Sequence, residues 1–215
     1  MILDSSTLIS LSNSCLLKVM EFLARKGARF EIPQSVREES ITRPLQLRSR
    51  AHDLSALSIQ RLIDREVITV SEANGNNLMD LANHVFYVKG RPIHLVDKGE
   101  ADALALAVDV KDYLVGIDER TTTSLIENPM GLKEHLEKEF RTHVMFNEEN
   151  YNAFVAKVGK IGVVRSSELV AFAYEQGFFN EWRDKRRVLL ASLYRLKYNG
   201  CGITFKELDE YHNLF

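Results

Sequence analysis

The chain has 215 residues, of which 45% are hydrophobic and 27% charged, with 28 Lys plus Arg against 30 Asp plus Glu and a formal net charge of −2. This composition indicates a globular protein with one core, or one core and an appendage, and excludes disordered, collagen-like and disulfide-scaffold chains. Because the net charge is close to zero, binding of nucleic acid would need a local basic patch.

The cysteines and the apolar runs bear on the compartment. Cys15 and Cys201 make neither a disulfide framework nor a zinc cluster, which favours a reducing compartment. No apolar run approaches the ~18 residues of a membrane span, and the first residues carry neither a basic n-region nor an apolar export segment. We therefore expect a soluble, cytoplasmic protein that does not enter a membrane.

Short strands and helices alternate over residues 1–146, which favours an α/β fold with a mostly parallel sheet. The predicted strands are 2–3, 30–32, 67–70, 113–117 and an edge strand at 143–146. Predicted helices begin at Ser5 or Ser6 and after Pro33, and others cover 16–24, 45–63, 77–88, 98–110, 121–127 and 132–140. The helix at 98–110 is apolar nearly all round, which indicates that it is buried.

From residue 147 onward the pattern is helical. Asn147 and Ser166 or Ser167 are candidate helix caps, 181–197 is a longer helix, and Thr204 with Glu207 forms a capping-box pattern for a last short helix. We expect residues 147–215 to be a helical C-terminal extension packed on the domain formed by residues 1–146.

Acidic residues recur where the predicted strands end and the following helices begin. They are Asp4, Glu38, Glu39, Glu100, Asp102 and Asp118. The carboxyl ends of parallel strands meet at one crevice, so these carboxylates should converge there and repel one another. The surrounding helices supply no matching buried lysine, and all-oxygen ligands select Mg²⁺ or Mn²⁺ over Zn²⁺. The pattern therefore predicts a divalent-metal site.

Each acid also has a purely structural explanation. Asp4 and Asp118 could be N-caps, and either Glu38 or Glu39 could be a surface acid. Glu100 three residues after Asp97 matches a capping box, while a negative charge in the first helical turn, as at Asp102, is favoured by the helix dipole. What favours a site is the repetition of acids at equivalent positions in the fold.

Four segments resemble the acidic motifs of PIN-domain proteins, which include the VapC toxin ribonucleases and archaeal relatives. The segments are Met-Ile-Leu-Asp4-Ser-Ser, Pro33-Gln-Ser-Val36-Arg-Glu-Glu39, Gly99-Glu100-Ala-Asp102 and Leu114-Val-Gly-Ile-Asp118-Glu-Arg. The resemblance covers roughly residues 1–146. It implies a three-layer α/β/α PIN-like fold, to which the C-terminal helical extension is added.

Carried over by position, the resemblance implies that Asp4, Glu39, Glu100 and Asp118 are the catalytic, metal-binding residues for Mg²⁺ or Mn²⁺. Secondary candidates are Asp102, Ser6, Glu38, Glu119 and Thr121. Asp102 is secondary because residues two apart on a helix point about 200° away from each other. The sequence departs from the family pattern at Gly116, where many relatives have Thr or Ser, and in the further acid expected shortly after Asp118.

The function implied by the resemblance is metal-dependent hydrolysis of RNA, single-stranded or looped, to 5′-phosphate and 3′-hydroxyl ends. The family also implies a homodimer and, if the chain is a toxin, a small antitoxin protein that blocks the crevice; RNA processing is the other role. One alternative is a PIN-fold module that binds RNA or protein without cleaving. A phosphate-receiving signalling domain is a weaker alternative, because the sequence offers no good candidate for its lysine.

Two stretches are locally basic, at 37–65 and at 183–187, where the sequence reads Arg-Asp-Lys-Arg-Arg. Such stretches are more often solvated helix faces than binding sites. The nearby aromatic residues Phe178, Phe179 and Trp182 are typical of packing between the terminal helices and the core, with a dimer or partner surface as the alternative.

Overall fold

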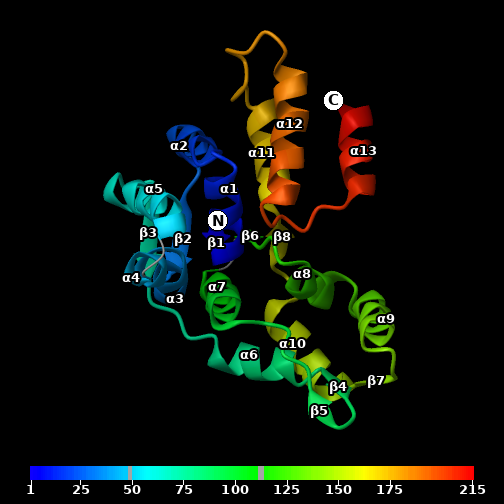
Figure 1. Cartoon of the computed structure of the whole chain (residues 1–215). Helices are drawn as coiled ribbons and strands as arrows, with labels where there is room; N and C mark the ends of the chain where they lie inside the picture. The colour runs from blue at the N-terminus through cyan, green and yellow to red at the C-terminus, as the bar shows by residue number, and fades with distance from the viewer. Residues whose placement is uncertain (48–49, 111–113) are drawn as a thin grey trace.

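The computed structural model describes residues 1–47, 50–110 and 114–215 (Figure 1). Its central sheet has the strand order β3-β2-β1-β6-β8, and every neighbouring pair is parallel. The strands are β1 (Ile2–Leu3), β2 (Phe30–Pro33), β3 (Ile68–Ser71), β6 (Leu114–Gly116) and β8 (Gly162–Val164). This confirms the α/β fold with a mostly parallel sheet. Of the strand predicted at 113–117, Tyr113 lies outside the described residues.

Helices cover both faces of this sheet and complete the three-layer α/β/α arrangement (Figure 1). Leu3 packs into a core with α1 (Ser5–Asn13), α2 (Lys18–Arg25), α5 (Asp53–Asp64), α11 (Ser166–Glu175), α12 (Lys185–Tyr198) and α13 (Phe205–Leu214). Ile2 packs into a second core with α6 (Asn76–Asn83), α7 (Lys98–Asp109), α8 (Arg120–Glu127), α9 (Pro129–Phe140) and α10 (Glu148–Val158). Adjacent strand residues point to opposite faces, so β1 contributes to both cores.

The helix predicted at 45–63 is interrupted after Gln46, and residues 48 and 49 of that prediction lie outside the described residues. Helix α3 (Gln34–Arg37) runs through a π-helical turn at Glu38–Thr42 into α4 (Arg43–Gln46). Leu47 has extended backbone angles, which end the helix, and the chain resumes with a 3₁₀ turn at Arg50–His52 before α5. The apolar spacing of this region is helical on both sides of the break, so periodicity alone did not reveal it.

The helix predicted at 77–88 was wrong in its second half. Helix α6 ends at Asn83, whose side-chain oxygen accepts from the amides of Leu95 (2.6 Å) and Val96 (2.9 Å). The chain then forms β4 (Phe86–Val88), which pairs antiparallel with β5 (Arg91–Pro92) and β7 (Val144–Phe146). The strand predicted near 143–146 therefore exists, and it belongs to this small second sheet.

The segment after residue 146 contains the expected helices and one strand that the helical prediction missed. Strand β8 lies beside β6, with Val163 opposite Val115, and extends the central sheet. Helix α12 begins at Lys185 rather than near 181, because Asp184 caps it by accepting from the Arg187 amide at 3.1 Å. The predicted capping box at Thr204 and Glu207 is confirmed at the start of α13.

Among the described residues, no single helix has both the length and the apolar composition to cross a membrane. Helices α1 and α2 reach that length and composition only when they are taken together, and the chain bends by 111° between them.

Candidate active site

A pocket of about 290 Å³ lies where the amino ends of α1, α7 and α8 approach the segment after α3. Its lining is rich in acids and hydroxyls: Asp4, Ser5, Ser6, Glu39, His94, Leu95, Asp97, Glu100, Glu119 and Thr121. The pocket thus contains three of the four primary candidates from the sequence. It also contains three of the secondary ones, Ser6, Glu119 and Thr121.

Asp4 follows β1 and is almost completely buried. Its Oδ2 accepts hydrogen bonds from the Ser6 amide at 3.0 Å and the Ser6 hydroxyl at 2.7 Å, so it caps α1 as well as lining the pocket. The Ser6 hydroxyl oxygen also accepts from the Asp118 amide at 3.0 Å. Burial raises the pKa of Asp4. Ser6 therefore fixes the carboxylate of Asp4 and ties β1 to the end of β6.

Glu39 lies in the π-helical turn after α3, beside the first turn of α7. Its Oε2 accepts from the Ser5 hydroxyl at 3.0 Å, and a Cβ placed on Gly99 would come within 2.6 Å of this oxygen. A glycine in α7 thus permits the close approach of the carboxylate. Burial, with the charges of Asp4 and Asp97, raises the pKa of Glu39, while Arg43 opposes the rise. The neighbouring Glu38 is exposed and lies outside the pocket.

Glu100 forms the capping-box contact and lines the pocket as well. Its Oε2 accepts from the Asp97 amide at 2.9 Å, and its Oε1 accepts from the Thr122 hydroxyl at 2.6 Å. Burial, followed by the charge of Asp4, raises the pKa of Glu100 to about 8. The sequence analysis missed the buried Thr122. Its signal was a hydroxyl residue one helical turn after Asp118, on the side of α8 that packs against α7.

Asp118 was predicted as the fourth member of this set, but it does not line the pocket. Its Oδ1 accepts from the Ser166 amide and its Oδ2 from the Ser166 hydroxyl, both at 2.6 Å, at the amino end of α11. Burial raises its pKa despite these bonds. The next residue, Glu119, caps α8 and does line the pocket, together with Thr121. The β6–α8 turn therefore brings Glu119, rather than Asp118, to the pocket.

Asp102 also lies outside the pocket, and its contacts are structural. Its Oδ1 accepts from the Gly75 amide at 2.7 Å, and its Oδ2 lies 2.9 Å from the Lys98 ammonium. A Cβ on Gly75 would come within 2.2 Å of Ala101, so the loop before α6 packs directly on the backbone of α7. Asp102 holds this loop in place.

The departure from the family pattern at Gly116 has a steric reason. A Cβ on Gly116 would lie 2.7 Å from Leu3 Cδ2 and 3.4 Å from Thr7 Cγ2. Since Leu3 is fully buried in the core beside β1, threonine or serine would not fit here without a shift of the neighbouring side chains.

The donor set of the pocket suits a hard divalent cation. Neither lysine nor arginine is among the described residues that line it, and its ionisable groups are five carboxylates and His94, which is bound to Asp97 Oδ1 at 2.6 Å. Across residues 1–47, 50–110 and 114–215, no three acid, histidine or cysteine side chains stand close enough to form a ready metal site. The carboxylates would therefore have to turn toward one another to bind a cation.

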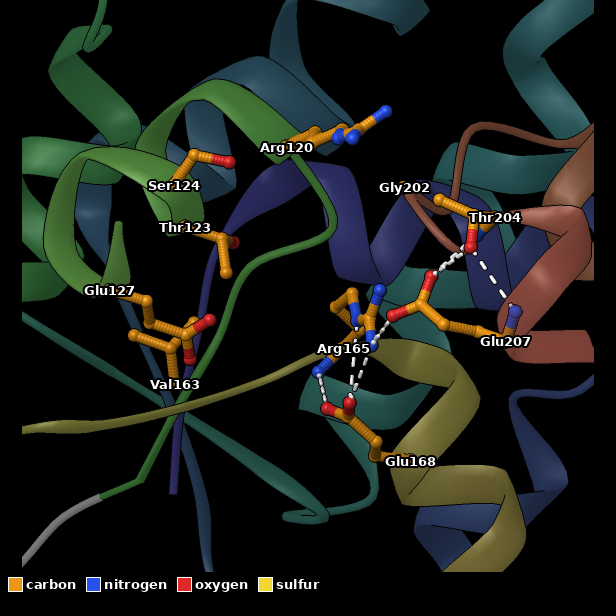
Figure 2. Close-up of a pocket in the computed structure, with 10 residues that line it drawn as sticks. All are labelled: Arg120, Thr123, Ser124, Glu127, Val163, Arg165, Glu168, Gly202, Thr204 and Glu207. Atoms are coloured by element: carbon orange, nitrogen blue, oxygen red, sulfur yellow. Dashed lines mark hydrogen bonds and ion pairs between the residues drawn. The ribbon is translucent and has the colours of Figure 1, made fainter. Parts of the chain in front are cut away.

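A second cavity, of about 220 Å³, is lined by residues of α8, β8, α11 and the segment that leads into α13 (Figure 2). Arg120 and Thr123 of α8 line it, facing Arg165 from the end of β8. The Arg165 guanidinium is 2.8 Å from both Glu168 Oε1 and Glu207 Oε1. Burial acts to raise the pKa of Glu207, but hydrogen bonds from Arg165 and Thr204 lower it to about 2. These ion pairs join β8, α11 and α13 behind the helix that presents Glu119.

The parallel sheet and the acidic pocket at its carboxyl edge define an α/β/α domain with a pocket in the place where such folds bind their ligands. A family model described as a PIN domain matches residues 1–129, and the chain belongs to the PIN-domain family. No curated protein and no solved structure matches the chain. PIN domains are commonly nucleases and generally use divalent metal ions, which agrees with the donor set of the pocket.

Proposed function

We propose that this chain is a Mg²⁺- or Mn²⁺-dependent endoribonuclease that hydrolyses RNA phosphodiester bonds. The observation that carries the proposal is the pocket lined by Asp4, Glu39, Glu100 and Glu119, to which the described part of the chain contributes neither a lysine nor an arginine. The pKa values of the first three are raised by burial, so their negative charge is poorly compensated by the protein itself. A divalent cation supplies that compensation.

When bound, such a cation lowers the pKa of a water molecule and neutralises charge at the scissile phosphate. The chain's own groups orient the ligands. Ser6 holds Asp4, Ser5 holds Glu39, and Thr122 with the Asp97 amide holds Glu100. Helices α1, α7 and α8 also direct their amino ends toward the pocket, where their dipoles favour both the carboxylates and an anionic phosphodiester.

We propose Asp4, Glu39, Glu100 and Glu119 as the metal ligands, with Asp118 as a positioning residue. Two variants distinguish Glu119 from Asp118. Glu119→Gln should weaken Mn²⁺ binding while leaving the unfolding midpoint in EDTA unchanged, because Glu119 is exposed and the glutamine oxygen can still accept from the Thr121 amide. Asp118→Ala should lower the midpoint, because the buried amide and hydroxyl of Ser166 would both lose their acceptor. The opposite pattern would return Asp118 to the ligand set.

The test of activity is cleavage of labelled single-stranded RNA in Mn²⁺ or Mg²⁺, with and without EDTA. Asp4→Asn is the informative variant, because asparagine also caps helices and so preserves the start of α1. Glu38→Gln is the matched control, since it removes an acid next to Glu39 that lies outside the pocket. We expect wild type and Glu38→Gln to cut, and Asp4→Asn to cut at least 10²-fold more slowly, the scale typical of a lost electrostatic contact. Equal cutting by Asp4→Asn would refute the assignment.

A second candidate function is a PIN-fold module that binds RNA or protein without cleaving. The observation that favours it is that the described carboxylates are not already gathered around one point. Binding of Mn²⁺ and of RNA without turnover, across several RNAs, would support this module over the nuclease.

A further inference from the structure

The turn between α11 and α12 carries an aromatic side chain that the fold does not use. Trp182 is the one tryptophan of the sequence, and 60% of it is exposed. Its neighbours behave differently: Phe178 and Phe179 contact each other (centroids 4.8 Å apart), and Phe178 contacts Phe22 of α2 at 5.3 Å. In the part of the chain that the structure describes, no ring or cation contact involves the Trp182 indole. Phe178 and Phe179 thus pack the turn against the protein, while most of the Trp182 side chain is exposed to solvent.

Four of the next five residues are cationic and exposed: Arg183, Lys185, Arg186 and Arg187. Within the described residues, none of them forms an ion pair with a carboxylate. Arg186 donates to the His212 carbonyl at 2.7 Å, which fixes it against α13, and Lys185 lies over the Tyr174 ring at 5.8 Å. Asp184, the one acid among these five residues, is the cap of α12. The stretch is therefore locally basic in a protein whose net charge is −2.

The end of α2 adds to this basic surface. The contact between Phe22 and Phe178 holds α2 beside the turn, as Figure 1 also shows, and Arg25 and Lys26 at the end of α2 are exposed. Lys26 lies over the Phe22 ring at 5.3 Å, so its position is fixed by the same aromatic cluster. Cations from two segments far apart in the sequence therefore lie near one aromatic cluster, formed by Phe22 and by Phe178 of the turn that also carries Trp182.

We propose that Trp182, Arg183, Lys185, Arg186 and Arg187, here called the basic tip, bind single-stranded RNA outside the acidic pocket. The indole would stack on a base while the cations contact phosphates, which is how proteins grip single strands without reading their sequence. This inference rests on the proposed nuclease function and adds a second contact for its substrate. A membrane surface or an acidic protein would account for the cations but would give the indole no stacking partner.

The two sites are far enough apart to require a long substrate. At ~1.5 Å per residue, the 14 residues of α12 span roughly 21 Å. Just beyond the other end of α12, the Gly202 amide donates to the Asp118 carbonyl at 3.0 Å, next to the turn that presents Glu119. An RNA that occupies both sites therefore has to run along this length of the molecule.

Because Trp182 is the one tryptophan, its fluorescence reports on the basic tip directly. We would titrate full-length Asp4→Asn protein, which leaves RNA uncut if the proposed function holds, with single-stranded oligouridine at several salt concentrations. We expect quenching of Trp182 emission and salt-dependent binding. Arg183→Gln with Arg187→Gln should reduce the salt slope by about 1.4, at about 0.7 for each lost phosphate contact with a single strand. The matched control, Lys138→Gln with Lys160→Gln, removes two exposed cations away from the tip and should keep the slope.

In a second arm, binding is read from the fluorescence anisotropy of dye-labelled oligouridine, because the variant lacks the tryptophan; Trp182→Leu should weaken binding roughly 5- to 150-fold, the range for one lost base stack. Unchanged Trp182 emission while oligouridine binds would overturn the inference, as would equal salt slopes for the tip and control variants. Quenching by anionic vesicles or by self-association, but not by RNA, would also overturn it, in favour of a membrane or a second copy. If RNA quenched Trp182 in a salt-dependent way but wild type cut no RNA, the basic tip would be upheld as an RNA-binding surface and the proposed nuclease activity would be refuted. The two proposals can therefore fail separately.

Discussion

Replacing Glu100 by glutamine should stabilise the metal-free protein at high pH. The native carboxyl has a pKa of about 8, against an ordinary value of 4.5, because it is buried beside Asp4. Below pH 4.5 it is protonated in both the folded and the unfolded protein. Above that, the unfolded chain releases the proton first, so the free energy of unfolding falls as the pH rises and levels off above about 8.

The size of the effect follows from the same values. At roughly 1.36 kcal/mol per pH unit, the difference between 4.5 and about 8 corresponds to about 5 kcal/mol once Glu100 is fully ionised. Glutamine is a close replacement, because its oxygen can accept from the Asp97 amide while its NH₂ group donates to the Thr122 hydroxyl. The variant should therefore match wild type near pH 5 and exceed it by several kcal/mol near pH 9.

Urea unfolding in EDTA, near pH 5 and near pH 9, measures the difference. Glu38→Gln is the control, because it removes an exposed acid from the adjoining segment. Saturating Mn²⁺ should restore the stability of wild type at high pH and do less for Glu100→Gln, which lacks the charge that a cation would compensate. If the difference in the free energy of unfolding between Glu100→Gln and wild type did not change with pH, burial would not be destabilising the charged form of Glu100, and the reasoning would be refuted.

Three further outcomes are expected. Asp102→Ala should lower the free energy of unfolding by about 1–3 kcal/mol, the cost of leaving the buried Gly75 amide unsatisfied, as read from the urea midpoint. Gly116→Thr should cost about 1–3 kcal/mol by overpacking against the adjacent strand, in the same assay. Glu207→Gln should remove stability that wild type has above about pH 4.5 and loses as the pH falls toward 2, because the charged Glu207 pairs with Arg165; acid titration followed by circular dichroism tests this.

The sequence predicted the sheet and most of its helices because their signals are local. Helix α7 is apolar on nearly all sides, and the carboxylates stand directly after short strands. The strand at Phe86–Val88 was missed because Asn83 turns its side chain to a loop twelve residues ahead, a contact that no window of sequence contains. Strand β8 was missed for a similar reason: its three residues pair with a strand almost fifty positions earlier.

The sequence was enough to predict which segments form the acidic pocket. It was not enough to predict which of two adjacent acids in a segment lines the pocket. Which of Asp118 and Glu119 reaches the pocket depends on Ser166, which draws Asp118 to the amino end of α11. The hydroxyls that hold the carboxylates were only partly visible: Ser6 is two residues from Asp4, but Thr122 contacts Glu100 from another helix. Side-chain choices of this kind depend on packing between distant segments.

Strand β8 has a consequence for how the chain can be divided. The family match ends at residue 129, yet β6 has β8 as its outer neighbour, and the Ile117 amide donates to the Val164 carbonyl at 3.0 Å. A fragment cut at residue 129 or 146 would expose the backbone of β6 as an open sheet edge, a known route to aggregation. It would also bury Asp118 without the two donors of Ser166. The stretch by which relatives are recognised is thus shorter than the stretch that the sheet requires, and expression trials should keep residues through α13.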